Sequence, residues 1–113
     1  MPALIAGLHS PIEKYDLPII NFGHAGNCNI HVNLLLNPDE PEQGKKALHC
    51  LYEIFSLVLA LNGTLTGEHG VGLEKRDFVD RELDAISLEL MRNIKRQFDP
   101  NGILNPDKML PLV

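Results

Sequence analysis

Two short glycine-flanked segments carry the residues of this chain that are suited to chemistry. The first, residues 23–31, reads Gly-His-Ala-Gly-Asn-Cys-Asn-Ile-His, and the second, residues 67–70, reads Gly-Glu-His-Gly. Together they hold three imidazoles and one carboxylate, which are side chains that bind divalent metals in proteins. The pattern therefore predicts a metal site with a further imidazole beside it.

The residues between His24 and His31 predict how the two imidazoles meet. Gly26, Asn27 and Asn29 tolerate left-handed backbone angles and are poor helix formers. We therefore expect a turn or bulge between the two histidines, and such a bend brings both rings to one point.

Glu68 and His69 are neighbours, and neighbouring side chains of an extended segment point in different directions. We expect Glu68 to bind the metal together with His24 and His31, and His69 to face the substrate as a base. Two imidazoles and one carboxylate leave coordination positions open, which is typical of a catalytic metal. Zinc fits this ligand set best, and manganese, iron and cobalt remain alternatives.

Length and composition set limits on the protein class. With 113 residues, 44% of them hydrophobic, the chain has the length of one small domain and is predicted to build one core. The net charge of −5 argues against a nucleic-acid partner. The start of the chain lacks the basic n-region of a signal peptide, and no apolar run is long enough to cross a bilayer. These features predict a cytoplasmic protein without a transmembrane segment.

The remaining histidines and the cysteines have plainer interpretations. His9 and His49 are assigned to packed or surface positions. Two cysteines, Cys28 and Cys50, are too few for a fold that is stabilised by disulfide bonds. Both are predicted to be free thiols, and Cys50 is predicted to be a core residue of a helix.

The elements that must position the site follow from hydrophobic periodicity. Residues 17–22 predict a buried strand after a turn at residues 14–16, and residues 29–36 predict a second strand with His31 and Asn33 on its polar face. Helices are predicted from Pro41 to Leu61 and over residues 84–98. The sum is an α+β fold: a small, mainly antiparallel sheet covered on one face by two or three helices.

Three motifs in order then resemble one family. Residues 23–31 resemble Gly-His-x-Gly-Asp-Gly-Asn-x-His, residues 67–70 match Gly-Glu-His-Gly, and residues 99–106 match Asp-Pro-x-Gly-x-Leu-Asn-Pro. From about residue 17 to 111 the chain is similar to the C-terminal part of the FAD-linked oxidases. That family contains D-lactate dehydrogenases, D-2-hydroxyglutarate dehydrogenases and the glycolate oxidase flavoprotein subunit.

The resemblance implies roles for the singled-out residues. His24, His31 and Glu68 fall on the family's metal ligands, His69 on its catalytic base and Asn33 on a substrate-contacting position. The family holds FAD mainly on a separate N-terminal domain, which this chain does not resemble. By this resemblance we expect residues 1–113 to be a single partial domain: the truncated, metal- and substrate-binding portion of a flavin-dependent D-2-hydroxy acid dehydrogenase or oxidase, inactive alone. Its expected partners are the missing flavin-binding domain and a small 2-hydroxy acid.

The first motif departs from the family pattern at two positions. Asn27 and Cys28 stand where the family usually has Asp and Gly. If that position has a positive φ, Cys28 is strained by about 1 kcal/mol or more.

The alternative functions are an autonomous metal-dependent hydrolase and a non-catalytic interaction module that uses its sheet and the helix from Pro41. An exposed sheet edge also makes a homo-oligomer an expectation.

Overall fold

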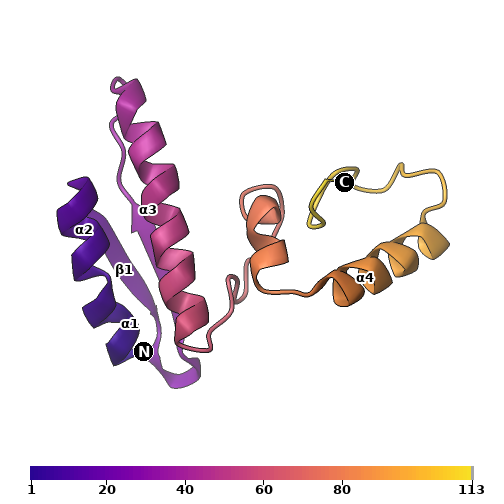
Figure 1. Cartoon of the computed structure of the whole chain (residues 1–113), viewed down its shortest axis with the longest axis horizontal. Helices are drawn as coiled ribbons and strands as arrows, with labels where there is room; N and C mark the ends of the chain where they lie inside the picture. The colour runs from indigo at the N-terminus through magenta and orange to yellow at the C-terminus, as the bar shows by residue number, and fades with distance from the viewer. Residues whose placement is uncertain (113) are drawn as a thin grey trace. The chain divides into compact units, whose positions relative to one another are not determined.

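The computed structural model describes residues 1–112, which form two compact units divided after Gly63. The first unit contains a β-hairpin and three α-helices, and the described part of the second contains one α-helix preceded by a 3-10 turn (Figure 1). In chain order the elements are α1 (Pro2–Gly7), α2 (His9–Tyr15), β1 (Ile19–His24), the 3-10 turn η1 (Ala25–Asn27), β2 (Asn29–Leu34), α3 (Pro41–Ala60), the 3-10 turn η2 (Arg76–Arg81) and α4 (Ala85–Phe98). The predicted α+β class with an antiparallel sheet is confirmed.

The hairpin has two chemically different faces because successive side chains of a strand point to opposite sides. β1 and β2 are antiparallel, and Phe22 lies directly opposite His31. Val32 and Leu34 pack against the apolar core of the first unit. His31 and Asn33 alternate with them and therefore share the other face, as the residue pattern predicts.

One apolar cluster joins the helices of the first unit to the hairpin. The long helix α3 contributes Ala47, Cys50 and Ile54, which lie on one stripe because they are spaced by three and four residues. Leu8 and Leu17 complete the cluster, each with only 1% of its surface exposed. Helices thus cover one face of the sheet, and Cys50 is a buried free thiol, as predicted.

Two short helices, α1 and α2, precede the hairpin where the residue pattern predicts only a turn at residues 14–16. They have six and seven residues and no side-chain caps, which is too short for a helix to be stable by itself. Contacts with α3 hold α2 in place, because the Tyr15 hydroxyl donates to Glu53 at 2.8 Å and Lys14 forms an ion pair with the same carboxylate. The predicted turn is present, since Asp16 ends α2 with φ of 52°. β1 begins two residues later than predicted and extends to His24.

The second unit begins with a loop and η2 and continues into α4. Phe78 and Val79 of η2 are buried, and the backbone N–H of Leu65 donates to the Glu82 carboxylate at 2.9 Å. α4 starts as predicted, because the Asp84 side chain caps it by accepting a hydrogen bond from the Ser87 backbone N–H.

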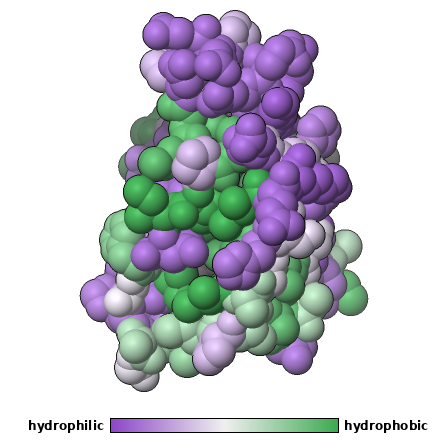
Figure 2. Space-filling view, turned by 90° about the vertical axis from the view of Figure 1, so that its left-hand side faces the viewer, coloured by the Kyte–Doolittle hydropathy of each residue, from purple (hydrophilic) through white to green (hydrophobic). Residues whose placement is uncertain are grey.

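Apolar side chains also reach the surface of the first unit. On the face shown in Figure 2, hydrophobic side chains gather in the middle, below a hydrophilic end. Ile20, Phe22 and Leu36 are among the exposed large apolar residues of this unit. A homo-oligomer that covers such a surface stays a prediction. None of the helices formed by the described residues is both long and apolar enough to span a bilayer.

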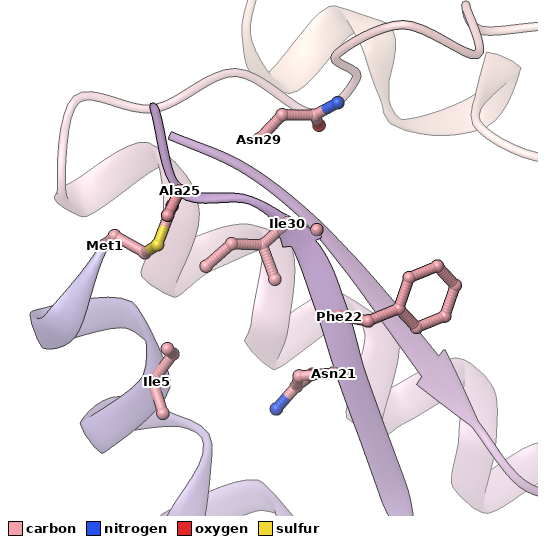
Figure 3. A pocket seen from close by; sticks show the side chains of 8 residues that line it. Met1, Ile5, Asn21, Phe22, Ala25, Asn29 and Ile30 are labelled. Carbon is pink, nitrogen blue, oxygen red and sulfur yellow. The ribbon is translucent and has the colours of Figure 1, made fainter. Parts of the chain in front are cut away.

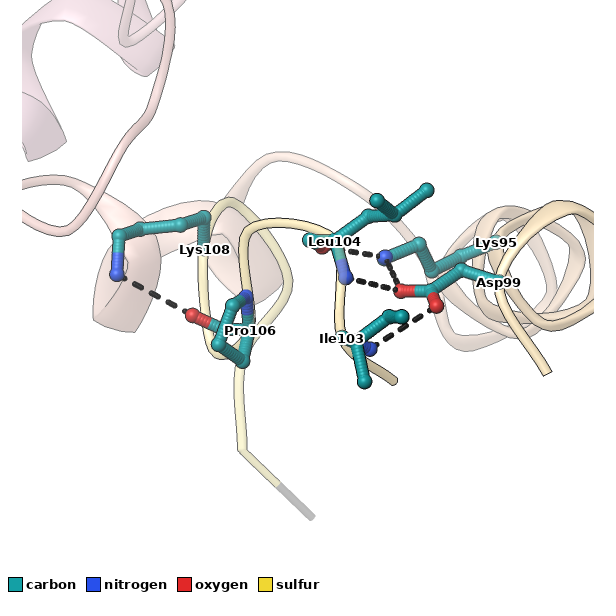
Figure 4. Close-up of polar contacts among 6 residues, drawn as sticks. All are labelled: Lys95, Asp99, Ile103, Leu104, Pro106 and Lys108. Atoms are coloured by element: carbon teal, nitrogen blue, oxygen red, sulfur yellow. Dashed lines mark hydrogen bonds and ion pairs between the residues drawn. The ribbon is translucent and has the colours of Figure 1, made fainter. Parts of the chain in front are cut away.

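A buried carboxylate organises the turn that follows α4 (Figure 4). Asp99 accepts hydrogen bonds from the backbone N–H groups of Ile103 and Leu104 at 3.0 and 2.9 Å, and it pairs with the Lys95 ammonium. That ammonium also donates to the Leu104 carbonyl at 2.7 Å. The bond from Lys95 lowers the pKa of Asp99, and the two backbone donors act in the same direction. The Asp-Pro-x-Gly-x-Leu-Asn-Pro motif is therefore a folded cap on α4.

The lowered pKa of Asp99 predicts an acid-sensitive turn. A carboxyl whose pKa is depressed on folding stabilises the fold above its unfolded pKa, and this stabilisation is lost as the pH falls through its folded pKa. We expect the amide resonances of Ile103 and Leu104 to shift together below about pH 4, as NMR spectra recorded across a pH series would show. In the Asp99→Asn variant, the chemical shifts of these two amides should not change with pH over that range. Pronounced acid shifts that persist in the variant would contradict this assignment.

Candidate functional site

The tip of the hairpin brings the two histidines of the first motif onto one face. His24 is the last residue of β1, and η1 with Cys28 reverses the chain before β2 begins. Cys28 has φ of 59° and ψ of 28°, the left-handed conformation that glycine adopts without strain. The predicted turn between His24 and His31 is confirmed.

The geometry of the two imidazoles fits a shared cation. Their ring centroids are 6.0 Å apart and their planes meet at 75°. A zinc–nitrogen bond of about 2.0–2.1 Å places each centroid about 3 Å from the metal, so two coordinated rings have centroids about 5–6 Å apart. His31 is half-buried and His24 is exposed at the open edge. Small side-chain movements therefore suffice to bring both rings onto one ion.

Asn33 lies on the same face as His31, two residues further along β2, and its side chain is exposed. Two residues on a strand advance by about 6.5 Å. This separation is too long for direct contact with a shared ion, but it is within the reach of a small organic acid bound beside the imidazoles. The position is compatible with the expected contact to substrate.

The second motif forms a bent loop in the second unit. Gly70 has φ of 76°, and the Thr66 hydroxyl donates to its carbonyl at 2.8 Å, which closes the loop. Because the segment is bent rather than extended, the side chains of Glu68 and His69 come closer than strand geometry predicts, with Oε1 and Nε2 3.8 Å apart. Both side chains are substantially exposed. The expected division of their roles stays a prediction.

Phe22 lies next to the candidate site, although the residue pattern did not single it out. Its ring stacks on the imidazole of His31, with centroids 4.8 Å apart and planes inclined by 29°. Residues 17–22 alone indicate only an apolar strand. The signal that places Phe22 beside His31 is the pairing of β1 with β2, which needs both strands and the length of the turn between them.

A shallow pocket lies on the side of the hairpin that faces α1 (Figure 3). Its volume is about 130 Å³, and its lining is mostly apolar, with Met1, Ile5 and Ile30 among the residues. Small-molecule sites usually occupy about 300–1,000 Å³. None of the expected site residues lines it, so it is not the candidate substrate site.

The strain at Cys28 leads to a testable prediction. Cys28→Gly should raise the free energy of unfolding by about 0.5–1 kcal/mol, because a left-handed conformation is unfavourable for residues with a Cβ. Urea unfolding followed by circular dichroism measures the difference. Cys28→Ala, which removes the thiol and keeps the Cβ, should bring no such gain. Equal stabilisation by both variants would show that the thiol, not the backbone, is responsible.

Comparison with known proteins identifies the class of protein. The family described as "FAD linked oxidases, C-terminal domain" matches residues 1–109, so the chain belongs to the FAD-linked oxidases. It is 38% identical to glycolate oxidase subunit GlcD of Bacillus subtilis, covering 94% of this chain and 23% of that protein. It is 39% identical to the mitochondrial D-lactate dehydrogenase [cytochrome] of Arabidopsis thaliana, covering 96% of this chain and 19% of that protein.

A third relative has a further substrate in its name. D-2-hydroxyglutarate dehydrogenase of Stutzerimonas stutzeri is 38% identical over 93% of this chain and 22% of its own length. The chain therefore spans about a fifth of the length of the curated relatives it matches. The resemblance drawn from the three motifs is confirmed, and it favours an oxidoreductase over the hydrolase alternative.

Proposed function

We propose that this chain provides the metal- and substrate-binding part of an FAD-dependent dehydrogenase or oxidase that acts on a small 2-hydroxy acid. The observation that carries the proposal is the pair of imidazoles on the open face of the hairpin, in a chain that belongs to the FAD-linked oxidases. Three relatives are named for glycolate, D-lactate and D-2-hydroxyglutarate, which are all 2-hydroxy acids.

In this proposal His24, His31 and Glu68 hold a divalent cation, with zinc as the first choice. The donor set supports it, because two imidazoles and a carboxylate suit zinc and leave positions open for substrate oxygens. A cation held there supplies Lewis acidity, which favours loss of the substrate's hydroxyl proton. In this proposal residues 1–113 act as a single partial domain.

The other assigned residues act on the substrate. His69 accepts the proton that leaves the hydroxyl group, a task for which imidazole is well suited at neutral pH. The Asn33 amide orients the substrate through a hydrogen bond from the same sheet face as His31. Flavin supplies the acceptor for the hydride that leaves the carbinol carbon. We assign its binding to a domain outside residues 1–113, so the isolated chain should bind metal without turning over substrate.

Metal analysis of the purified chain tests the ligand set. We expect one zinc per chain by elemental analysis after dialysis, and loss of that zinc on treatment with a strong chelator. Glu68→Gln should bind zinc more weakly, because it removes the only proposed anionic ligand. Glu74→Gln, which alters another exposed glutamate of the same unit, is the matched control and should bind like the unaltered chain.

Two activity measurements separate the proposal from its rivals. The isolated chain should not reduce an artificial electron acceptor with glycolate, D-lactate or D-2-hydroxyglutarate. Enzyme-like turnover by a flavin-free sample would overturn the assignment of the hydride acceptor. Ester hydrolysis that chelation abolishes would instead support a hydrolase, and a chain that binds no divalent metal would remove the metal centre.

A further inference from the structure

The polar face of the hairpin contains an aromatic residue that the proposed chemistry does not use. We infer that Phe22 is a positioning residue, which holds the imidazole of His31 in the orientation needed to bind the cation. The inference rests on the proposed function and adds to it a residue that acts through a metal ligand.

The contact between the two rings is built into the strand pairing. Phe22 and His31 are directly opposite each other in the antiparallel register. Their centroid separation of 4.8 Å and inclination of 29° describe a stacked pair, within the range of about 4.5–7 Å in which aromatic rings attract each other. A shift of register by one residue would move Phe22 to the other face, so the fold itself fixes this contact.

Stacking and metal binding use different parts of the same imidazole. Phe22 covers a face of the His31 ring, whereas the nitrogen lone pairs that bind metals lie in the plane of the ring. His24 meets this ring at a steep angle of 75°, so its own ring approaches along a different direction. The stack can therefore restrict the rotation of His31 without blocking its ligand atoms.

Packing of the core does not account for the position of Phe22. Its side chain is 62% exposed, and it is not part of the apolar cluster that joins the hairpin to the helices. Figure 3 shows Phe22 and its neighbour Asn21 pointing to opposite sides of β1. Ile20 lies on the same face as Phe22 and is 51% exposed, but it is opposite Asn33 rather than a histidine. Ile20 thus offers a matched control.

Phe22→Ala, Phe22→Tyr and Ile20→Ala, each made in the full chain, test the role. In the metal-free protein, the His31 ring protons should show an upfield ring-current shift that Phe22→Ala removes. The same variant should bind zinc about three- to tenfold more weakly, in line with the strength of an aromatic pair. Its cobalt complex should give broader and weaker d–d absorption bands, because the His31 ligand is less well oriented. Phe22→Tyr should restore all three properties, and Ile20→Ala should change none of them.

The outcomes separate this role from the metal site itself. If the unaltered chain binds zinc and Phe22→Ala binds it equally well with the same cobalt spectrum, Phe22 is not a positioning residue. Equal weakening by Ile20→Ala and Phe22→Ala would mean that the face is only being destabilised, and it would also overturn the role. If the unaltered chain binds neither zinc nor cobalt, the proposed function fails, and the role of Phe22 fails with it.

Discussion

Replacement of both His24 and His31 by alanine is expected to lower the zinc affinity of the chain by at least about 100-fold, since even residues that only support a ligand contribute about 10- to 100-fold. The fold should survive, because both side chains lie on the face of the hairpin opposite to the helices. Removing His31 also removes its stack on Phe22, so we expect a loss of about 1 kcal/mol in the free energy of unfolding. Competition with a chromophoric chelator measures the affinity, and circular dichroism verifies the fold.

The same variant should lose the thermal stabilisation that the metal provides. A ligand present at about 100 times its dissociation constant stabilises a folded protein by about 2.7 kcal/mol if it binds only that state. Added zinc should therefore raise the unfolding temperature of the unaltered chain and leave that of the double variant unchanged. His9→Ala combined with His49→Ala is the matched control, because both of these histidines are exposed and lie outside the hairpin. If the variant that lacks both His24 and His31 still binds zinc as tightly as this control, the proposed metal site is wrong.

Local patterns predicted the parts of the fold that depend on short-range periodicity. α3 and α4 show apolar residues at three- and four-residue steps and clear stop signals, and both helices form close to the expected residues. The alternation along β2 likewise placed His31 and Asn33 on the polar face, as observed. These features are encoded in neighbouring residues, so the sequence alone is sufficient for them.

Long-range contacts decide what the sequence did not reveal. α1 and α2 are too short to be stable alone, and contacts such as Tyr15 with Glu53 connect residues far apart in the chain. The stack of Phe22 on His31 depends on the register of two strands and not on either strand alone. The 3.8 Å between Glu68 Oε1 and His69 Nε2 depends on the conformation of their loop, in which Gly70 has φ of 76°. A sequence reports where such backbone angles are possible rather than which are adopted. The turn and the strand face that bring His24 and His31 together were thus predictable, but the contacts that orient their side chains were not.

The backbone at Gly23 leads to the second large expected effect. Gly23 pairs with Ile30 next to both histidines, and a Cβ added there would lie 2.2 Å from the Asn29 carbonyl oxygen and 2.9 Å from the Ile30 Cα. Backbone atoms cannot move aside as a flexible side chain can. Gly23→Ala should therefore separate the strands at the tip of the hairpin and destabilise the chain by about 1–3 kcal/mol, the usual range for overpacking. Because His24 and His31 adjoin this pair, zinc affinity should fall by about 10- to 100-fold, the range for groups that orient metal ligands, and less than in the double histidine variant.

The Gly26→Ala variant shows whether the effect of Gly23→Ala comes from the steric clash or would follow from replacing any glycine at the turn. Gly26 is also in the hairpin tip, three residues later, but an added Cβ there would have nothing within 4 Å. We expect Gly26→Ala to keep both zinc affinity and stability, the latter within about 0.5 kcal/mol. Amide hydrogen exchange gives the decisive readout, since only Gly23→Ala should lose protection in the paired residues of β1 and β2 nearest the turn. If both variants behaved like the unaltered chain, the close approach of the two strands at Gly23 would not be what holds the imidazoles together.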